Sequence, residues 1–537
     1  MGYPGYGAQM STLVDGILAN ARAGRGTLVF HLDAERRELP ATELLDLAAR
    51  AAAVLEERGI GRGGRVGLLG ATRPEWAIWA VATWLQGAAL VPLQIPVRLT
   101  SLESLKERVT AVADDAGLGA VVVMPEFLGA VPERLAVSWD ELGSEPAAPV
   151  TIDEDDAAVV QYTSGSTSTP KGVVISHRAA LAFIGGLAEA CSSFASKPLG
   201  WVPLFHDLGL VIYLLHPLLS CAEGQLLPTE RFARDPSLWL ELIAEEGITH
   251  LVTPQTGLAA AIKTADRKGR AIDLSSVRVV TFGAEAVDPT FVDLLTTRAE
   301  ELSFDPGTLG SSYGLAEATL AVTCTRPGDG LHRLDVDPQA LRIHGRVESP
   351  THAVRTLVSA GTPFYGAARP RIVDDEGNVL PDDQVGNIEV SGATLMDGYL
   401  NQPSPIRQGW LSTGDLGFLH EGELFMTGRR KDMLVVLGQN YYPEDVEWAA
   451  ARQPGVRAGR AVAFSVEDEL VLLVEAADDA PEELERLLRD RLAEEVGVVP
   501  HEVIVVARGA IEKTTSGKLR RSTMRARYEE GELSPVS

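Results

Sequence analysis

The stretch of this chain best suited to hold an anion is a run of small hydroxyl residues and glycines between Tyr162 and Gly172. It reads Tyr-Thr-Ser-Gly-Ser-Thr-Ser-Thr-Pro-Lys-Gly, so glycine amides, hydroxyl groups and one ammonium group fall within a single loop. Glycines let backbone N–H groups approach a ligand, hydroxyls add donors, and lysine adds a positive point charge. We therefore expect a phosphate cradle formed by Thr163, Ser164, Gly165, Ser166, Thr167 and Lys171.

Apolar residues flank this loop on both sides. Residues 157–162 and 172–176 predict two buried strands, so the loop should connect a hairpin. A P-loop NTPase would instead have a helix after the loop and the GxxxxGK[ST] spacing, which is absent. The alternative is a solvated Ser/Thr/Gly linker, although linkers are seldom closed by Pro-Lys-Gly between apolar strands.

Two later clusters could complete a nucleotide site. Residues 310–320 contain Ser-Tyr-Gly, which suits a flat adenine ring, followed by Glu317, whose carboxylate could hold Mg²⁺. Residues 410–417 contain Thr-Gly-Asp, and the carboxylate of Asp415 can accept hydrogen bonds from both ribose hydroxyls. An ordinary solvated carboxylate is the alternative for Glu317.

Taken in order, these clusters resemble the motifs of the adenylate-forming superfamily, which includes acyl-CoA synthetases, nonribosomal adenylation domains, luciferases and fatty acyl-AMP ligases. Three features most resemble the fatty acyl-AMP ligase branch. They are Pro-Leu-Phe-His-Asp-Leu-Gly-Leu at 203–210, Ala-Glu-Ala-Thr at 316–319, and the long connector between Gly314 and Gly361. The resemblance covers nearly the whole chain and implies ATP and Mg²⁺ as cofactors.

The resemblance also implies a role for each matched residue. The catalytic residues would be Lys518, His206 and Glu317, with His206 beside the acyl carboxylate and Glu317 as the metal ligand. Residues 208–219 would line an acyl tunnel, with a core histidine and a buried core helix as the alternatives for these two features. The adenosine part of the nucleotide would contact Gly283, Ala284, Glu285, Ser312, Tyr313, Gly314, Asp415 and Arg429.

Helices and strands alternate through the first 150 residues, which predicts an α/β fold. The resemblance implies a large N-terminal domain over 1–427, built of two α/β sheets layered with helices plus a small β-barrel-like subdomain. A hinge at 428–431 would join it to a small mobile α+β domain over 432–537. Residues 330–355 resemble an insertion that braces the C-terminal domain and disfavours the CoA-accepting pose.

Composition limits the partners. A formal net charge of −26 argues against binding to nucleic acid or to an anionic membrane.

The three cysteines, Cys191, Cys221 and Cys324, show neither a disulfide framework nor a zinc-binding spacing and are expected in the core. With no signal-peptide pattern and no apolar run of ~18 residues, we expect a cytoplasmic protein without a membrane span. A few basic residues near the C-terminus, among them Arg520 and Arg525, could dock an acidic carrier protein.

The predicted reaction is attack of a carboxylate on the α-phosphate of MgATP, which forms acyl-AMP and releases pyrophosphate. The acyl group of a fatty or other hydrophobic acid would then pass to the phosphopantetheine thiol of an acyl carrier protein. One alternative is an acyl-CoA ligase. An alternative of another class is a protein that binds ATP or acyl-adenylate without adenylating, although Lys518, Glu317 and Asp415 are all present.

Overall fold

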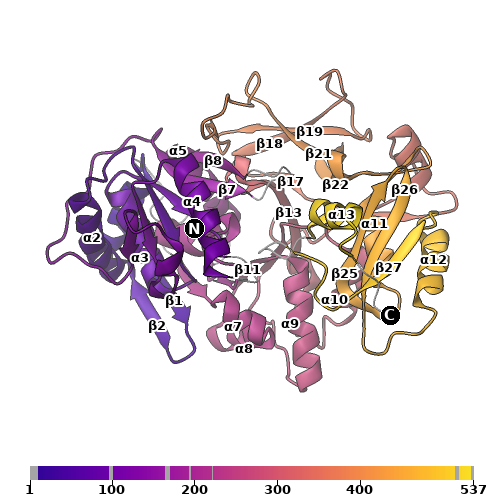
Figure 1. Cartoon of the computed structure of the whole chain (residues 1–537), viewed down its shortest axis with the longest axis horizontal. Helices are drawn as coiled ribbons and strands as arrows, with labels where there is room; N and C mark the ends of the chain where they lie inside the picture. The colour runs from indigo at the N-terminus through magenta and orange to yellow at the C-terminus, as the bar shows by residue number, and fades with distance from the viewer. Residues whose placement is uncertain are drawn as a thin grey trace.

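A computed structural model describes residues 10–95, 101–163, 170–192, 195–220, 222–513 and 519–533. Figure 1 shows helices and sheets of the N-terminal half on one side, an antiparallel sheet in orange, and the C-terminal residues in yellow as a separate unit. Within the described residues, no helix is both long enough and apolar enough to cross a membrane.

The largest sheet has seven strands in the order β20-β8-β7-β4-β3-β5-β6. Its strands are β3 (Arg65–Leu69), β4 (Ala89–Pro92), β5 (Ala120–Val123), β6 (Ala136–Ser138), β7 (Ala157–Thr163), β8 (Lys171–Ser176) and β20 (Gly398–Tyr399). The helices of this region are α1 (Leu13–Arg22), α2 (Ala41–Glu57), α3 (Pro74–Leu85), α4 (Leu102–Ala116) and α5 (His177–Ala190). Strands β7 and β8 pair in antiparallel fashion, which confirms the predicted hairpin.

Two further sheets complete the α/β part. One has the order β2-β1-β10-β9, from β1 (Thr27–His31), β2 (Arg36–Pro40), β9 (Leu199–Gly200) and β10 (Glu223–Leu226). The other has the order β11-β12-β13-β14-β17, from β11 (His250–Thr253), β12 (Val279–Phe282), β13 (Leu309–Gly314), β14 (Ala321–Cys324) and β17 (Thr362–Pro363). Their helices are α6 (His216–Ser220), α7 (Thr229–Arg234), α8 (Ser237–Glu246), α9 (Gln255–Lys268) and α10 (Pro289–Thr297).

A four-stranded antiparallel sheet follows, where a β-barrel-like subdomain was expected. Its order is β18-β19-β21-β22, from β18 (Ala368–Val373), β19 (Gly386–Gly392), β21 (Leu411–His420) and β22 (Glu423–Arg429). The predicted insertion over 330–355 contains β15 (Arg333–Val336) and ends where its antiparallel partner β16 (Arg355–Val358) begins, so it is not irregular throughout.

The C-terminal residues form a small α+β unit, as expected. It contains β23 (Leu434–Val436), β24 (Gln439–Tyr441), α11 (Pro443–Ala451), β25 (Val456–Val466), β26 (Glu469–Ala476), α12 (Leu484–Glu495), β27 (Glu502–Val506) and α13 (Arg521–Glu529). Strands β25, β26 and β27 form one sheet, whose apolar side chains make clusters separate from the large N-terminal core. The position of the hinge at 428–431 stays a prediction.

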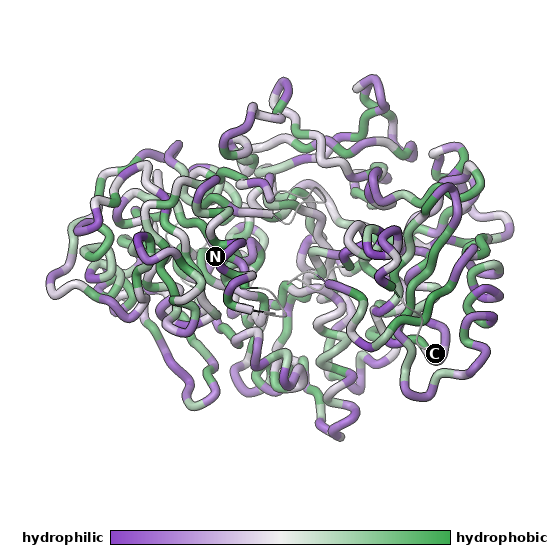
Figure 2. The backbone as a smooth tube through the Cα atoms, viewed as in Figure 1, coloured by the Kyte–Doolittle hydropathy of each residue, from purple (hydrophilic) through white to green (hydrophobic). Residues whose placement is uncertain are grey.

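The main core is built by helices and strands that are apolar on more than one face. Helix α3 is buried along nearly its whole length, and its three tryptophans, Trp76, Trp79 and Trp84, are fully buried. A helix that is hydrophobic all round must lie inside the protein. Figure 2 shows the same pattern in the C-terminal sheet, where green strands are bordered by purple helices and loops.

Candidate active site

A cavity of about 940 Å³ lies where the seven-stranded sheet, the β11–β14 sheet and the C-terminal domain meet. Two chemically different groups of residues line it. One group carries polar side chains or exposes backbone at the predicted nucleotide motifs, and it includes Thr163, Lys171, His206, Gly283, Ala284, Ser312, Gly314, Glu317, Asp415 and Arg429. The apolar group includes Phe183, Leu187, Leu208, Ile212, Val252 and Phe364. The structure therefore gathers ten of the predicted site residues around one space.

Asp415 is the centre of the first polar cluster. Its carboxylate accepts a hydrogen bond from the Tyr313 hydroxyl at 2.7 Å and lies 2.9 Å from Nε of Arg429. Burial, followed by the charge of Asp415, raises the pKa of Tyr313 well above its usual value, so the phenol remains a donor. The Asp415 side chain is only 5% exposed, which fixes its orientation at the cavity wall. Tyr313 itself is not among the residues that line the cavity.

Glu317 belongs to a second polar cluster that includes a residue the sequence did not indicate. The Tyr399 hydroxyl donates to Oε1 of Glu317 at 2.8 Å, and Nζ of Lys171 lies 4.9 Å from the centre of the Tyr399 ring. Tyr399 lies on β20, which pairs with β8 beside the predicted phosphate loop. A carboxylate bonded to the hydroxyl and an ammonium group near the ring of one tyrosine therefore both line the cavity.

The loop after β12 carries the residues predicted to contact adenine. Gly283 and Ala284 line the cavity, and Ala284 adopts a left-handed backbone with φ of 69°. Such a conformation is costly for a residue with a side chain and is concentrated at functional sites. The Glu285 carboxylate accepts from the backbone N–H of Thr256, in the first turn of α9, and does not line the cavity.

Besides its predicted contact with the nucleotide, position 314 requires glycine for steric reasons. A Cβ atom on this residue would lie 1.7 Å from the carbonyl oxygen of Leu320, so only glycine fits where β13 turns into β14. The glycine thus holds Glu317, which lies in that turn, at the cavity wall.

His206 lies at the cavity wall among both polar and apolar neighbours. Its Nδ1 atom is 2.6 Å from Oδ1 of Asp207 and accepts from the backbone N–H of Leu208 at 3.3 Å, so the ring is oriented by its neighbours in the sequence. Leu208 and Ile212 line the cavity, while the rest of 209–219 is buried without lining it. The segment is a π-helical turn over Gly209–Leu215 followed by α6.

Five of the predicted residues lie outside the described parts of the chain, namely Ser164, Gly165, Ser166, Thr167 and Lys518. Their described neighbours border the cavity. Thr163 and Lys171 line it on either side of the phosphate loop, and residues 519–523 line it from the C-terminal domain. Burial lowers the pKa of Lys513, and the charge of Glu285 partly opposes this shift, so Lys513 lies within electrostatic range of the loop after β12.

The insertion packs against the C-terminal domain. Arg355 lies 3.0 Å from the Asp445 carboxylate, and its guanidinium is 4.1 Å from the Tyr442 ring centre. The guanidinium of Arg342 is 4.4 Å from the ring centre of Tyr441. Two apolar residues of the insertion, Val336 and Leu341, share a cluster with Tyr442. These contacts confirm that the segment braces the C-terminal domain; its effect on the CoA-accepting pose stays a prediction.

The basic residues near the C-terminus are paired within the chain. Arg520 and Arg527 contact Glu512, Arg525 contacts Glu529, and Arg521 contacts Glu447. Their charge is therefore largely neutralised by glutamates of the same domain, which weakens the idea that they dock an acidic carrier protein.

Comparison with known proteins gives the class of this chain. The profile of the family described as AMP-binding enzyme matches residues 19–400, well over half of the sequence. The chain therefore belongs to this family and is an enzyme of the ligase type. The match confirms the predicted resemblance to the adenylate-forming superfamily.

Individual relatives indicate the branch of the superfamily to which the chain is most similar. The chain is 35% identical to a Mycobacterium tuberculosis protein named as a ligase, over 87% of this chain and 90% of the relative. It is 31% identical to the medium-chain-fatty-acid–[acyl-carrier-protein] ligase JamA of Moorena producens, over 91% of this chain and 90% of the relative. A structure from a study of fatty acyl-adenylate ligases of E. coli and L. pneumophila is 28% identical with a TM-score of 0.89, covering 98% of this chain and 99% of that one. These likenesses confirm the fatty acyl-AMP ligase branch.

Proposed function

We propose that this enzyme converts a hydrophobic carboxylic acid and ATP into acyl-AMP and pyrophosphate, and then transfers the acyl group to the phosphopantetheine thiol of an acyl carrier protein. One observation carries the proposal: a single cavity is lined both by charged residues, including Asp415, Glu317 and Lys171, and by apolar residues, including Phe183 and Leu187. A site for ATP-dependent activation of an apolar acid needs both kinds of lining in one space.

Different polar residues of the cavity would contact different parts of ATP. Asp415, held by Tyr313 and Arg429, presents a fixed carboxylate suited to the ribose hydroxyls. Lys171 and Thr163 border the loop that would hold the phosphates. In the first step, an oxygen of the acid attacks the α-phosphorus, a new P–O bond forms, and the bond to the β-phosphate breaks so that pyrophosphate leaves. Negative charge on the phosphoryl oxygens would be stabilised by Lys171 and by Lys518.

The donor set at Glu317 fits Mg²⁺. A carboxylate oxygen is the ligand that Mg²⁺ prefers, and this ion usually takes one or two protein carboxylates together with water and phosphate oxygens. The Tyr399 hydroxyl bonds one oxygen of Glu317 and thereby orients the carboxylate at the cavity wall. When bound, Mg²⁺ would neutralise phosphate charge, and the task of Glu317 and Tyr399 is to hold it there.

The acceptor is proposed to be a carrier protein because the insertion fastens the C-terminal domain through Arg355 and Arg342. JamA, a relative named for transfer to an acyl carrier protein, supports the same choice. In the second step, the thiolate sulfur attacks the acyl carbon, a thioester forms, and AMP leaves. Coenzyme A is the second candidate acceptor, favoured by relatives named as fatty-acid–CoA ligases at 32% identity.

A cytoplasmic location belongs to the same proposal, because thiols stay reduced there.

The test is acid-dependent exchange of labelled pyrophosphate into ATP. We expect exchange with hydrophobic acids and none without acid. Lys518→Ala should abolish exchange while ATP still binds, whereas Lys263→Ala, on the exposed side of α9, should not change it. Undiminished exchange in Lys518→Ala would contradict the catalytic role of that lysine. Absence of exchange with every acid would contradict the proposed function.

A further inference from the structure

At the cavity wall, three residues that can bind a metal come together from distant parts of the chain. Cys191 directly follows α5, His216 begins α6, and His250 begins β11. Their ligand atoms all lie within 4.8 Å of one another, and all three residues are buried. No acidic residue belongs to this group of the described chain, so the donors are two imidazole nitrogens and one sulfur.

A fourth donor lies among these three. The hydroxyl oxygen of Ser196 is 3.1 Å from Nε2 of His216 and 3.2 Å from Nδ1 of His250. Ser196 also hydrogen-bonds the Cys191 thiol, and the Cys191 sulfur is 3.7 Å from Nδ1 of His250. Tetrahedral zinc, with bonds of about 2.0 Å to nitrogen and about 2.3 Å to sulfur, places its ligand atoms roughly 3.3–3.6 Å apart. The distances of 3.1, 3.2 and 3.7 Å between these donor pairs are close to those of a tetrahedral zinc shell.

The proton positions around His216 leave one of its ring nitrogens able to bind a metal. The Ser220 hydroxyl donates to the backbone carbonyl of His216 at 2.5 Å, so its oxygen must accept at Nδ1 of His216, 2.9 Å away. Nδ1 therefore carries the proton, and Nε2 offers a lone pair toward Ser196 and the cluster. A metal-binding histidine nearly always donates its other ring N–H to such an outer partner.

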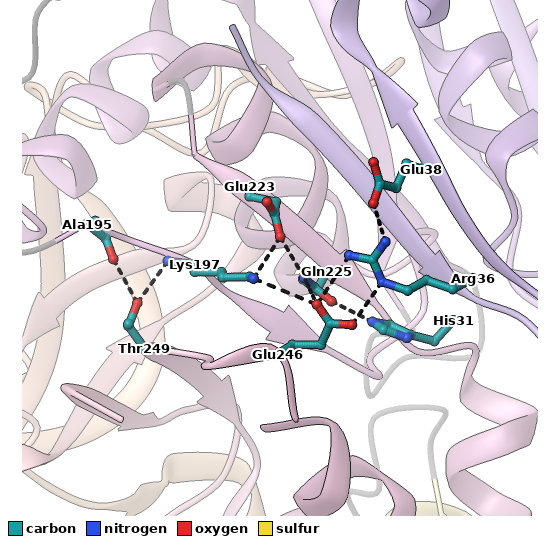
Figure 3. A network of polar contacts seen from close by, with 9 residues as sticks. All are labelled: His31, Arg36, Glu38, Ala195, Lys197, Glu223, Gln225, Glu246 and Thr249. Carbon is teal, nitrogen blue, oxygen red and sulfur yellow. Dashed lines mark hydrogen bonds and ion pairs between the residues drawn. The ribbon is translucent and has the colours of Figure 1, made fainter. Parts of the chain in front are cut away.

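The segment that carries Ser196 is held in place by the contacts of Figure 3. The Thr249 hydroxyl donates to the carbonyl of Ala195 at 2.9 Å and accepts from the backbone N–H of Lys197 at 2.9 Å. The ammonium group of Lys197 in turn contacts Glu223 at 2.9 Å and Glu246 at 3.7 Å. Because Ser196 lies between Ala195 and Lys197, and His250 follows Thr249, these bonds set the distance between the two donors.

We propose that Cys191, His216 and His250, with the Ser196 hydroxyl or a water at the fourth corner, form a structural zinc site. The N₂S donor set suits Zn²⁺ better than the hard ions Mg²⁺ or Ca²⁺. The ion would join the end of α5, the start of α6, the start of β11 and the 195–197 segment.

Two residues of the proposed site, Cys191 and His250, line the cavity, which gives the ion a path of entry. His250 pairs with Val279 at the start of β12, whereas the nucleotide loop at Gly283 follows the end of that strand. At about 3.3 Å per residue, these two levels lie roughly 13 Å apart, so the proposed site is separate from the loop predicted to contact adenine.

Zinc binds cysteine as the thiolate and histidine through a neutral ring nitrogen. Binding at this site must therefore release the thiol proton, and we expect the affinity for zinc to rise with pH.

The experiment uses the untagged full-length chain under reducing conditions, loaded with Co²⁺ as a spectroscopic substitute for Zn²⁺. We expect about one ion per chain, visible absorption typical of tetrahedral cobalt, and a thiolate-to-cobalt charge-transfer band that Zn²⁺ abolishes. Cys191→Ser should lose the charge-transfer band, whereas Cys324→Ser, which removes another cysteine of the cavity wall, should keep it.

Ser220→Ala supplies a variant that leaves every ligand in place. It should weaken metal binding by about 10–100-fold, because it removes only the outer partner of His216. If the folded wild-type chain shows no charge-transfer band, or if the band persists in Cys191→Ser, the proposal is wrong and the cluster is a hydrogen-bonded part of the cavity wall. Because metal content is measured directly, this result is independent of whether the enzyme forms acyl-AMP.

Discussion

At the scale of single residues, Glu317 and Tyr399 have different proposed tasks. The Glu317 carboxylate supplies the negative charge for Mg²⁺, and the Tyr399 hydroxyl orients that carboxylate. Glu317→Gln removes the negative charge and keeps a group that can accept from Tyr399. We expect kcat/KM for MgATP to fall by about 10–100-fold, which corresponds to the loss of a charge-assisted interaction. Pyrophosphate exchange over a range of Mg²⁺ concentrations measures this effect.

Tyr399→Phe is the matched control because it removes only the hydroxyl that donates to Glu317. A loss of about three- to tenfold is expected, in line with one hydrogen bond. A larger loss in Tyr399→Phe than in Glu317→Gln would contradict the role of Glu317 as the metal ligand.

Buried histidines make the fold sensitive to acid. Burial lowers the pKa of His177 to about 4, below the value of 6.5 that it has when exposed. Since the unfolded chain binds the proton more readily, the stabilisation is complete above pH 6.5 and is lost as the pH falls from 6.5 toward 4. Each such histidine contributes about 1.4 kcal/mol per pH unit in that window. Denaturant unfolding at pH 7 and pH 5 measures the change.

His177→Asn should make this pH dependence shallower, because asparagine keeps an acceptor for the backbone N–H of Leu13, 3.3 Å from Nδ1 of His177, but does not titrate. His352→Asn, at an exposed position, should leave the dependence unchanged. An unchanged dependence in His177→Asn would show that this histidine is not buried in the neutral form.

Sequence reasoning found the residues that belong to contiguous motifs and missed those that meet only in the fold. Asp415 and Glu317 stand in recognisable runs, but Tyr399 reaches Glu317 across 82 positions and has no local signal. Cys191 was expected as a core residue, and it is buried. Its two histidine neighbours are too distant in the sequence for a metal-binding spacing to be visible, since His250 alone is 59 positions away.

At the scale of elements, the turn from β13 to β14 depends on Gly314. Gly314→Ala would place a methyl group 1.7 Å from the Leu320 carbonyl, so the turn must move. We expect a loss of about 1–3 kcal/mol in the free energy of unfolding and a lower activity, because Glu317 lies in this turn. Gly61→Ala is the control, since a Cβ there meets no atom within 4 Å. Equal stability of the two variants would contradict the steric argument.

The insertion fastens the C-terminal domain through Arg355. Arg355→Met would leave Asp445 without this cation and remove the guanidinium from the Tyr442 ring. We expect faster proteolysis between the domains and a higher yield of acyl-CoA when CoA is supplied, because the domain is less tightly held. The contact should be worth about 1–3 kcal/mol.

Arg355→Lys keeps the charge but loses the planar group, so its effect should be intermediate. Unchanged proteolysis and an unchanged acyl-CoA yield in Arg355→Met would show that the insertion does not restrain the domain. The sequence predicted such a brace from resemblance, but not the two arginine–aromatic contacts, because these side chains lie about 90 residues apart.

At the scale of the whole molecule, the α/β fold, the hairpin of the phosphate loop and the small C-terminal domain were all predictable. Continuous apolar runs, such as 120–123 and 157–162, predict strands because a strand that is buried on both faces needs apolar side chains on both. The placement of the C-terminal domain was not predictable, since it rests on long-range pairs such as that between Arg355 and Asp445.

Mass spectrometry of the products formed from MgATP and a panel of carboxylic acids tests the central claim most directly. The reactions are run with an acyl carrier protein bearing phosphopantetheine, with CoA, and with neither. We predict that acyl-AMP of a hydrophobic acid accumulates without an acceptor, persists with CoA, and is consumed by the carrier protein to form a thioester. ATP left intact with every acid, with no acyl-AMP detected, would contradict the account.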